Sequence, residues 1–135
     1  MLEGVGTGEE GSLVLGTDWW NVESWGVWGQ TRSTLWMMPP ASDNESYRLT
    51  VFARAFPPNP VSYQRVTVYV DGKLTTVWDV QASEGEFSVA VQRSRGHAVK
   101  VEFVVEKPVS PHDIGVSADT RVLGLGLSKF RLDLL

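Results

Sequence analysis

Apolar and polar side chains alternate along most of the chain with a period of two residues. This period places successive side chains on opposite faces of an extended strand. No segment carries the sustained 3.6-residue apolar period of an amphipathic helix. The pattern therefore predicts strands over Ser12–Gly16, Thr31–Met38, Arg48–Phe56, Tyr63–Val70, Lys73–Val80, Glu86–Gln92, His97–Glu106 and Arg121–Leu134.

Proline, glycine and polar residues separate these runs and predict the connections between strands. Proline lacks a backbone N–H and stops a strand, and glycine and serine favour turns. The longest connection, Pro108–Ala118, leaves room for one helical turn near His112. The other predicted connections are a strand end at Pro39-Pro40, a polar loop over Ala41–Ser46, an extended loop over Pro57–Pro60 and a turn over Arg93–Gly96.

Asp71-Gly72 between two alternating runs is the clearest local signal, because this dipeptide favours two-residue hairpin turns. With such a turn, Arg65 pairs with Trp78 and Tyr69 pairs with Leu74. One face then points outward, and the other points to the core. The predicted outer or concave surface contains Arg65, Tyr69 and Trp78, and the predicted core face contains Val66, Val68 and Val77.

The last strand changes its apolar phase. Leu123, Leu125 and Leu127 share one parity, whereas Phe130 and Leu132 share the other. One extra residue in a strand shifts every later side chain to the opposite face. The sequence therefore predicts a β-bulge near Ser128-Lys129.

About eight short strands and no helix predict an all-β fold, a two-sheet antiparallel β-sandwich that is jelly-roll-like. An immunoglobulin-like sandwich is the alternative, although its tyrosine corner and Cys-Trp-Cys pattern are not visible. The 135 residues suit one domain over 12–135. Residues 1–11 are glycine-rich and are expected to be a flexible linker or a remnant outside the domain.

The amino-acid composition argues against several classes of binding partner. The net charge of −4 comes without any basic run, which argues against nucleic acid and anionic membranes. There is no cysteine, so disulfide and thiol chemistry are excluded. No apolar run is long enough for membrane insertion, and residues 1–10 do not resemble a signal peptide. These features leave the localisation open between the cytoplasm and the cell surface as part of a larger protein.

Tryptophans gather in one stretch, Asp18–Trp28, which contains Trp19, Trp20, Trp25 and Trp28. A core strand cannot bury four indoles so close together, because alternate side chains face opposite ways. We expect Trp19 or Trp20 to close the core. Gly26 separates the other two and could present both to a ligand, because an indole offers a flat apolar face and one N–H donor.

Glu23 is the carboxylate within this stretch. It could accept hydrogen bonds from ligand hydroxyls, or it could pair with Arg54 or Arg121, and the pairing is the favoured interpretation. Ser117 and Asp119 precede the last strand and are expected to fix a tight turn by accepting backbone N–H bonds. An Asp119–Arg121 contact would fix the exit from that turn.

Three stretches together carry a resemblance: Trp20–Trp28 followed by a strand that ends at Pro39, Pro108–Leu125 leading into the last strand, and Gln64-Arg65-Val66 with Val70-Asp71-Gly72. The chain resembles the accessory β-sandwich domains of bacterial glycosyltransferases and other surface-polysaccharide proteins over most of residues 18–135. The resemblance implies a jelly-roll-like sandwich with a glycan-related role and no catalysis of its own. The chain departs from that pattern at Gly29-Gln30, where a serine is more usual.

Catalytic and metal motifs are weak. His97 and His112 have no spacing of a metal pair, and no nucleophile elbow occurs. Gly124-Leu-Gly126 lacks the third glycine of a nucleotide loop. We therefore predict no catalytic residue, no enzyme activity and no cofactor. A structural calcium ion is not readable from sequence, and Asp133 with an acid near residue 18 is the weak candidate.

The sequence therefore predicts a non-catalytic carbohydrate-binding module, an accessory domain of a bacterial glycan-handling protein. Its partners would be a glycan or oligosaccharide and a neighbouring domain. The alternative is a structural or docking sandwich for domain–domain or self association, in which tryptophans anchor the interface. The candidate ligand-binding residues are Trp25, Trp28, Glu23, Arg54, Arg65, Trp78 and Tyr69.

Overall fold

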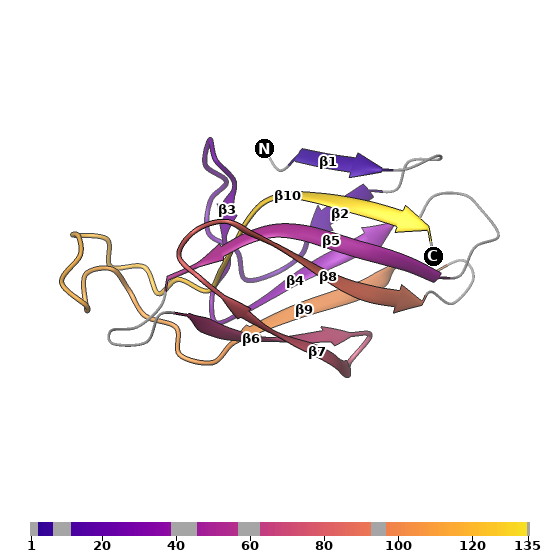
Figure 1. Cartoon of the computed structure of the whole chain (residues 1–135). Helices are drawn as coiled ribbons and strands as arrows, with labels where there is room; N and C mark the ends of the chain where they lie inside the picture. Colours follow the sequence, from indigo (N-terminus) through magenta and orange to yellow (C-terminus); the bar gives the residue numbers. More distant parts are fainter. Residues whose placement is uncertain (1–2, 7–11, 39–45, 57–62, 93–96, 135) are drawn as a thin grey trace.

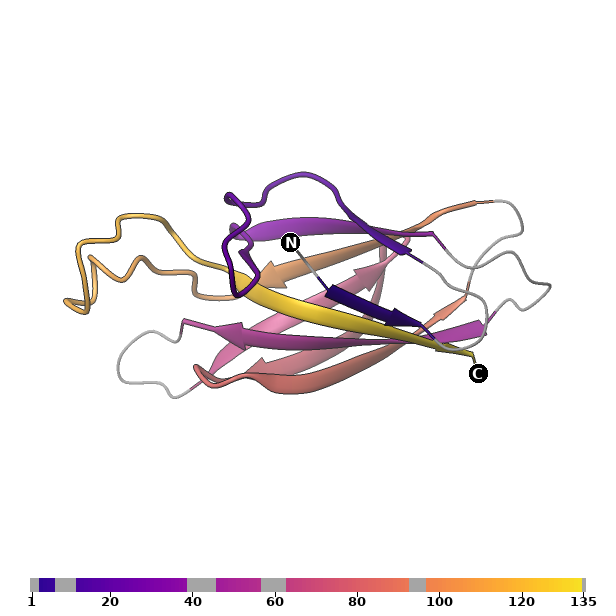
Figure 2. The same cartoon turned by 90° about the horizontal axis from the view of Figure 1, so that it is seen from above.

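The computed structural model describes residues 3–6, 12–38, 46–56, 63–92 and 97–134 (Figures 1 and 2). These described residues form strands and turns, with no helix. The strands are β1 (Glu3–Gly6), β2 (Ser12–Leu15), β3 (Val27–Trp28), β4 (Arg32–Met38), β5 (Ser46–Ala55), β6 (Gln64–Val70), β7 (Lys73–Val80), β8 (Gly85–Gln92), β9 (Val99–Val105) and β10 (Leu125–Leu134).

The strands form two packed sheets, which confirms the predicted all-β, jelly-roll-like sandwich (Figure 2). Sheet A has the order β1-β10-β5-β8, with β3 also paired to β10, and sheet B has the order β2-β4-β9-β6-β7. Adjacent strands are antiparallel, except that β1 runs parallel to β10. Strands distant in sequence are therefore neighbours: β5 lies beside β10, and β4 lies beside β9.

The core lies between the two sheets and follows the predicted alternation. In β5, Leu49, Val51 and Ala53 are buried, while the intervening positions face out of sheet A. Val68 of β6 and Val101 of β9 are fully buried in sheet B, as predicted. Trp19 packs partly buried against this core, which confirms one of the two tryptophans expected to close it.

The β6–β7 hairpin departs from the predicted register. Tyr69 does pair with Leu74, but a bulge between Val68 and Tyr69 shifts the rest, so that Val66 pairs with Trp78. The predicted faces of two residues are therefore wrong. Trp78 lies in the core with 6% of its surface exposed, and Val77, expected to be buried, is 45% exposed. A one-residue slip exchanges the faces of every later side chain.

The predicted bulge in the last strand is confirmed, because the β10–β5 register shifts between Leu127 and Lys129. Glu3–Gly6, within the stretch expected to be a flexible linker or remnant, pair with β10 as strand β1. Backbone pairing to an open sheet edge needs no particular side chain, so glycines do not prevent it. The expectations for Pro39-Pro40, residues 41–45, residues 57–60 and the turn at 93–96 lie outside the described residues.

Candidate functional site

Residues 18–30, called the tryptophan loop below, fold back on themselves beside the start of β10 (Figure 1). The Trp20 N–H donates to the Trp28 carbonyl over 2.9 Å, and the Gln30 N–H donates to the Asp18 carbonyl over 2.9 Å. At the tip, the Glu23 N–H donates to the Gly26 carbonyl over 2.7 Å. These bonds give the loop a fixed shape before any ligand is considered.

The loop lies directly on β10. Trp28 pairs with Gly126, and Val27 pairs with Leu127. Gly26 has a φ of +153°, and a Cβ atom there would lie 2.1 Å from the Leu127 carbonyl oxygen. Glycine is therefore required for this close approach, which supports the expectation that Gly26 shapes the arrangement of the neighbouring tryptophans.

Trp25 and Trp28 form an edge-to-face pair over the outer face of sheet A. Their ring centroids are 5.1 Å apart with an interplanar angle of 65°, a favourable aromatic geometry. Both rings lie over Gly126, where a Cβ atom would lie 2.8 Å from Trp28 Cζ3 and 3.0 Å from Trp25 Cη2. Both tryptophans remain partly exposed. We call Trp25, Trp28 and Gly126 the indole platform.

Arg54 joins this platform from β5. It pairs with Gly126 across the sheet, and its Cζ lies 4.7 Å from the centroid of the Trp25 ring. Arg54 Nη2 also lies 3.8 Å from Glu84 Oε1. The structure thus brings three of the predicted ligand residues, Trp25, Trp28 and Arg54, to one place.

Polar groups continue along the same face. Ser128 Oγ hydrogen-bonds with Glu84 and donates to the Phe52 carbonyl over 3.3 Å. Lys129 Nζ lies 4.7 Å from the centroid of the Phe52 ring. These residues were not among the predicted ligand residues, because they come together only through the long-range pairing of β5 with β10. The alternation in β5 does place Phe52 and Arg54 on one face, which was the available signal.

Glu23 makes the predicted pairing with Arg121 on the other side of the tryptophan loop. Arg121 Nη1 lies 3.2 Å from Glu23 Oε2, and Arg121 Nη2 lies 2.8 Å from Asp119 Oδ2. The expected turn is also present, since Asp119 Oδ1 accepts the Arg121 backbone N–H over 3.0 Å and the Ser117 hydroxyl accepts the Asp119 N–H over 3.2 Å. The network ties the tryptophan loop to the segment before β10.

Hydrogen bonding sets the ionisation of this network. The Arg121 side chain and backbone N–H groups lower the pKa of the Asp119 carboxyl below its ordinary value. The same contact raises the pKa of Arg121. Trp20 completes the cluster by donating its Nε1–H to the Val122 carbonyl over 3.1 Å, with Arg121 Cζ 6.0 Å from its ring centroid. The ion pairs of Arg121 and the hydrogen bond of Trp20 therefore hold the tryptophan loop against the segment before β10.

The remaining predicted ligand residues lie on or inside sheet B, away from the indole platform. Arg65 is half-exposed beside Asp79 at 3.7 Å and Glu106 at 4.0 Å. Tyr69 lies 5.9 Å from the guanidinium of Arg32. Trp78 is a core residue, stacked at a tilt against Phe87 and Phe103, so its predicted place beside Arg65 on an outer surface is wrong.

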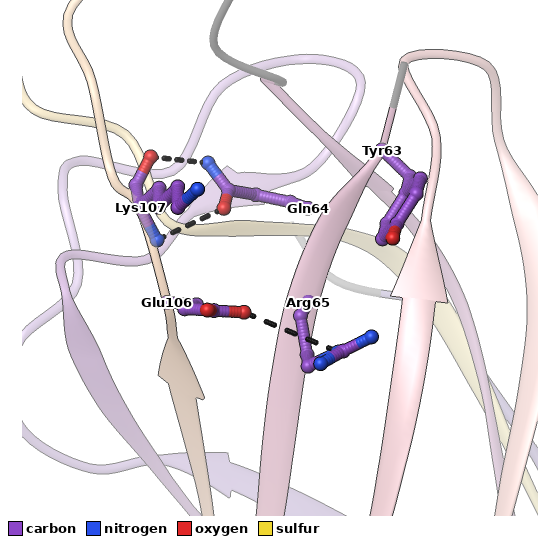
Figure 3. Close-up of a pocket in the computed structure, with 5 residues that line it drawn as sticks. All are labelled: Tyr63, Gln64, Arg65, Glu106 and Lys107. Carbon is purple, nitrogen blue, oxygen red and sulfur yellow. Dashed lines mark hydrogen bonds and ion pairs between the residues drawn. The ribbon is translucent and has the colours of Figure 1, made fainter. Parts of the chain in front are cut away.

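A shallow pocket of about 110 Å³ lies beside Arg65, lined by Tyr63, Gln64, Arg65, Glu106 and Lys107 (Figure 3). Gln64 is buried, and its amide hydrogen-bonds with the backbone of Lys107. Arg65 and Glu106 face each other across the pocket (Figure 3). Its polar groups are thus largely satisfied by one another, and it contains none of the tryptophans.

A sixth tryptophan, Trp36, faces out of sheet B and is 37% exposed. Val14 is its register partner on β2, and Met38 is the next outward residue on β4. The two flanking side chains are 48% and 40% exposed. The alternation of side chains in β4, which places Trp36 and Met38 on one face, is the signal in the sequence that could have revealed this apolar patch.

Within the described part of the chain, no three His, Asp or Glu side chains gather as metal ligands would. The pairing of Asp133 with an acid near residue 18 is wrong. Asp133 lies near the end of β10 and accepts a 2.9 Å hydrogen bond from Arg131, whereas Asp18 bonds Gln30 near the start of that strand. Over the same residues, there is also no helix of the length and hydropathy that a membrane span needs.

No protein-family model matches the sequence, and comparison with curated protein sequences gives no match. Solved structures do match the fold. The CBM36-1 domain of a multidomain xylanase from the hindgut metagenome of Trinervitermes trinervoides superposes with a TM-score of 0.50 and 14% identity, over 91% of this chain and 94% of that one.

An active site mutant of a family two carbohydrate esterase from Clostridium thermocellum matches 93% of this chain and 33% of its own, with a TM-score of 0.50 and 10% identity. A family 35 carbohydrate binding module from an environmental isolate matches with a TM-score of 0.48 and 12% identity, over 98% of this chain and 80% of that one. At such identities the likeness shows the sandwich fold alone.

Proposed function

We propose that this chain is a non-catalytic carbohydrate-binding module that binds an oligosaccharide at the indole platform on the outer face of sheet A. The observation that carries the proposal is the pair of partly exposed indoles of Trp25 and Trp28, fixed over Gly126 beside Arg54. A sugar ring has an apolar C–H face and a rim of hydroxyls, so it suits an aromatic surface edged by hydrogen-bonding groups.

The platform is preorganised for such a ligand. Trp25 is held between the edge-to-face contact with Trp28 and the guanidinium of Arg54, and the loop below is braced by the Glu23–Arg121 ion pair. Little side-chain entropy is then lost on binding, which is the main way a small site gains affinity. In this proposal Arg54 donates to ligand hydroxyls, and Glu23 supports the loop.

We further propose an accessory role, in which the domain keeps a larger bacterial protein, such as a glycosyltransferase, on its glycan. Two facts support this extension. The sequence resembles accessory domains of that kind, and one structure of similar fold is itself a domain of a multidomain xylanase. Loss of glycan association by the parent protein after the domain is deleted would test the accessory role.

The binding function is tested by a glycan array on the isolated chain, followed by calorimetry with any glycan that binds. Affinity near the millimolar end, about −4 kcal/mol, is expected for one small platform. Trp25→Ala should abolish detectable binding, because a loss of ~1–2 kcal/mol from so small a total is decisive. The absence of binding to every glycan class on the array would refute the proposal.

A second candidate function is docking onto a neighbouring domain or a second copy of the chain. The exposed patch of Val14, Trp36 and Met38 on sheet B favours it, because contiguous apolar surface is common at interfaces. Measurement of the solution mass separates the two functions. Self-association of the wild type that Trp36→Asp abolishes would support docking, whereas a monomer at all concentrations would exclude a homotypic interface.

A further inference from the structure

Two neighbouring cations on the outer face of sheet A, Arg54 and Lys129, are weakly paired with carboxylates. Among the residues that the structure describes, Arg54 has one long ion pair, with Glu84 at 3.8 Å, and its buried Nε has no hydrogen-bond partner. Lys129 has no ion pair with a side chain that the structure describes; it lies opposite Glu3 of β1 in the register, and its ammonium lies 4.7 Å from the centroid of the Phe52 ring. The chain as a whole has a net charge of −4, so these cations stand out against an acidic background.

Both cations lie on aromatic rings, and the ion pair between Arg54 and Glu84 is long, at 3.8 Å. Arg54 lies over Trp25, and Lys129 lies over Phe52, each 4.7 Å from the ring centroid. A ring contacts a guanidinium through its flat face and leaves the N–H groups at its edge available. The ammonium of Lys129 likewise keeps donors directed away from the ring. Stacking therefore positions both groups without using up their hydrogen-bonding capacity.

The register makes the two cations diagonal neighbours on the same face. Arg54 pairs with Gly126, and Phe52, two residues earlier on β5, pairs with Lys129. Side chains two residues apart on a strand lie about 7 Å apart on the same face. Arg131, the next cation along β10, is different, because Asp133 at 2.9 Å and Glu86 at 3.3 Å already pair with it.

We propose that the ligand of this face is an acidic glycan, whose carboxylate or sulfate group binds between Arg54 and Lys129 while a sugar ring lies on the indole platform. This inference rests on the proposed glycan-binding function and specifies its ligand class. Charge-assisted hydrogen bonds to an anionic oxygen are stronger than those to a neutral hydroxyl. Arg54 and Lys129 should therefore give an acidic sugar a higher affinity than a neutral one.

The test compares three probes on the full chain by calorimetry: an oligogalacturonate, a sulfated heparin oligosaccharide and a neutral cello-oligosaccharide. Binding to one or both acidic probes, weakened as NaCl rises from about 50 to 500 mM, is expected from screening of the ion pairs. The two acidic probes distinguish carboxylate from sulfate. Binding to the neutral probe alone would overturn the inference and leave the proposed function standing, and so would binding to none of the three probes while the array shows another glycan bound. Absence of binding to every glycan on the array would overturn both.

Lys129→Gln removes the charge and leaves a polar side chain that is one atom shorter, without touching the indole platform. It should lower affinity for the acidic probe roughly tenfold, while Lys129→Arg should restore it. Arg65→Gln on sheet B is the matched control and should bind like the wild type, and melting temperatures verify folding. Unchanged acidic-probe affinity in Lys129→Gln would overturn the inference even if the wild type binds that probe.

Discussion

Gly126→Ala is the most direct perturbation of the indole platform, because it adds one methyl group beneath both rings. The new Cβ would lie 2.8 Å from Trp28 Cζ3, 2.9 Å from Trp28 Cε3 and 3.0 Å from Trp25 Cη2. These separations are well inside van der Waals contact, so both indoles must move. Overpacking of this kind costs about 1–3 kcal/mol.

Alanine also favours a strand over glycine by roughly 0.5–1 kcal/mol, because glycine loses more backbone entropy on folding. The two effects oppose each other and leave a net destabilisation of about 1–2 kcal/mol, measured as the free energy of unfolding in urea. Glycan binding should fall together with stability, because the displaced rings no longer present the same surface.

A double-mutant cycle separates the two effects. In a Trp28→Ala background, two of the three close contacts at Gly126 disappear, and the strand preference of alanine remains. Gly126→Ala should then become neutral or stabilising by up to about 0.5 kcal/mol. The same destabilisation in both backgrounds, within about 0.3 kcal/mol, would show that the rings do not lie where the structure places them.

Three further predictions, tested on four variants, concern the core packing and the ion pairs of Arg121. Trp78→Ala should cost about 3–5 kcal/mol of unfolding free energy in urea, whereas Val77→Asp should change it by less than about 0.5 kcal/mol; the reverse order would restore the unshifted hairpin register. Val68→Asp should prevent folding, because an unpaired charge buried between sheets costs several kcal/mol, and a soluble variant with an unchanged melting temperature would contradict this. The lowered pKa of Asp119 means that its pairing with Arg121 stabilises the fold fully above about pH 4 and is lost as the pH falls through the folded-state pKa. Melting temperatures of wild type and Asp119→Asn should therefore differ at pH 6 and converge as the pH falls through the folded-state pKa of Asp119, and a gap that stays constant in acid would refute this.

The alternation of side chains predicted the inward faces wherever a strand keeps one phase, as for Val68 and Val101. It also located the β10 bulge, because the apolar phase itself changes there. The bulge in β7 is not marked by a clear change of apolar phase in the sequence. One signal was present, however: the unshifted register puts Asp79 on the same face as the core residue Val66, and a buried unpaired carboxylate is unfavourable.

The candidate site was predictable only in part, because some of its residues are far apart in the sequence and meet only through strand pairing. The aromatic content and the turn at Gly26 are local features, so the tryptophan loop could be identified from sequence. Phe52, Ser128 and Lys129 join it because β5 pairs with β10, and no local pattern specifies which strands become neighbours. The same limit applies to Gly126, whose role depends on rings from a distant loop.

Glycan binding at the indole platform is tested most directly by calorimetry. One glycan, identified on the array, is titrated into three variants that each replace one tryptophan with alanine. Trp25→Ala and Trp28→Ala remove the two rings of the indole platform, and Trp36→Ala removes an exposed ring on the opposite sheet. We expect at least a tenfold loss of affinity, about 1.4 kcal/mol, in the first two variants, which should keep their fold by circular dichroism, and wild-type affinity in the third. Wild-type affinity in Trp25→Ala and Trp28→Ala, together with loss in Trp36→Ala, would contradict this expectation and move the glycan site to sheet B.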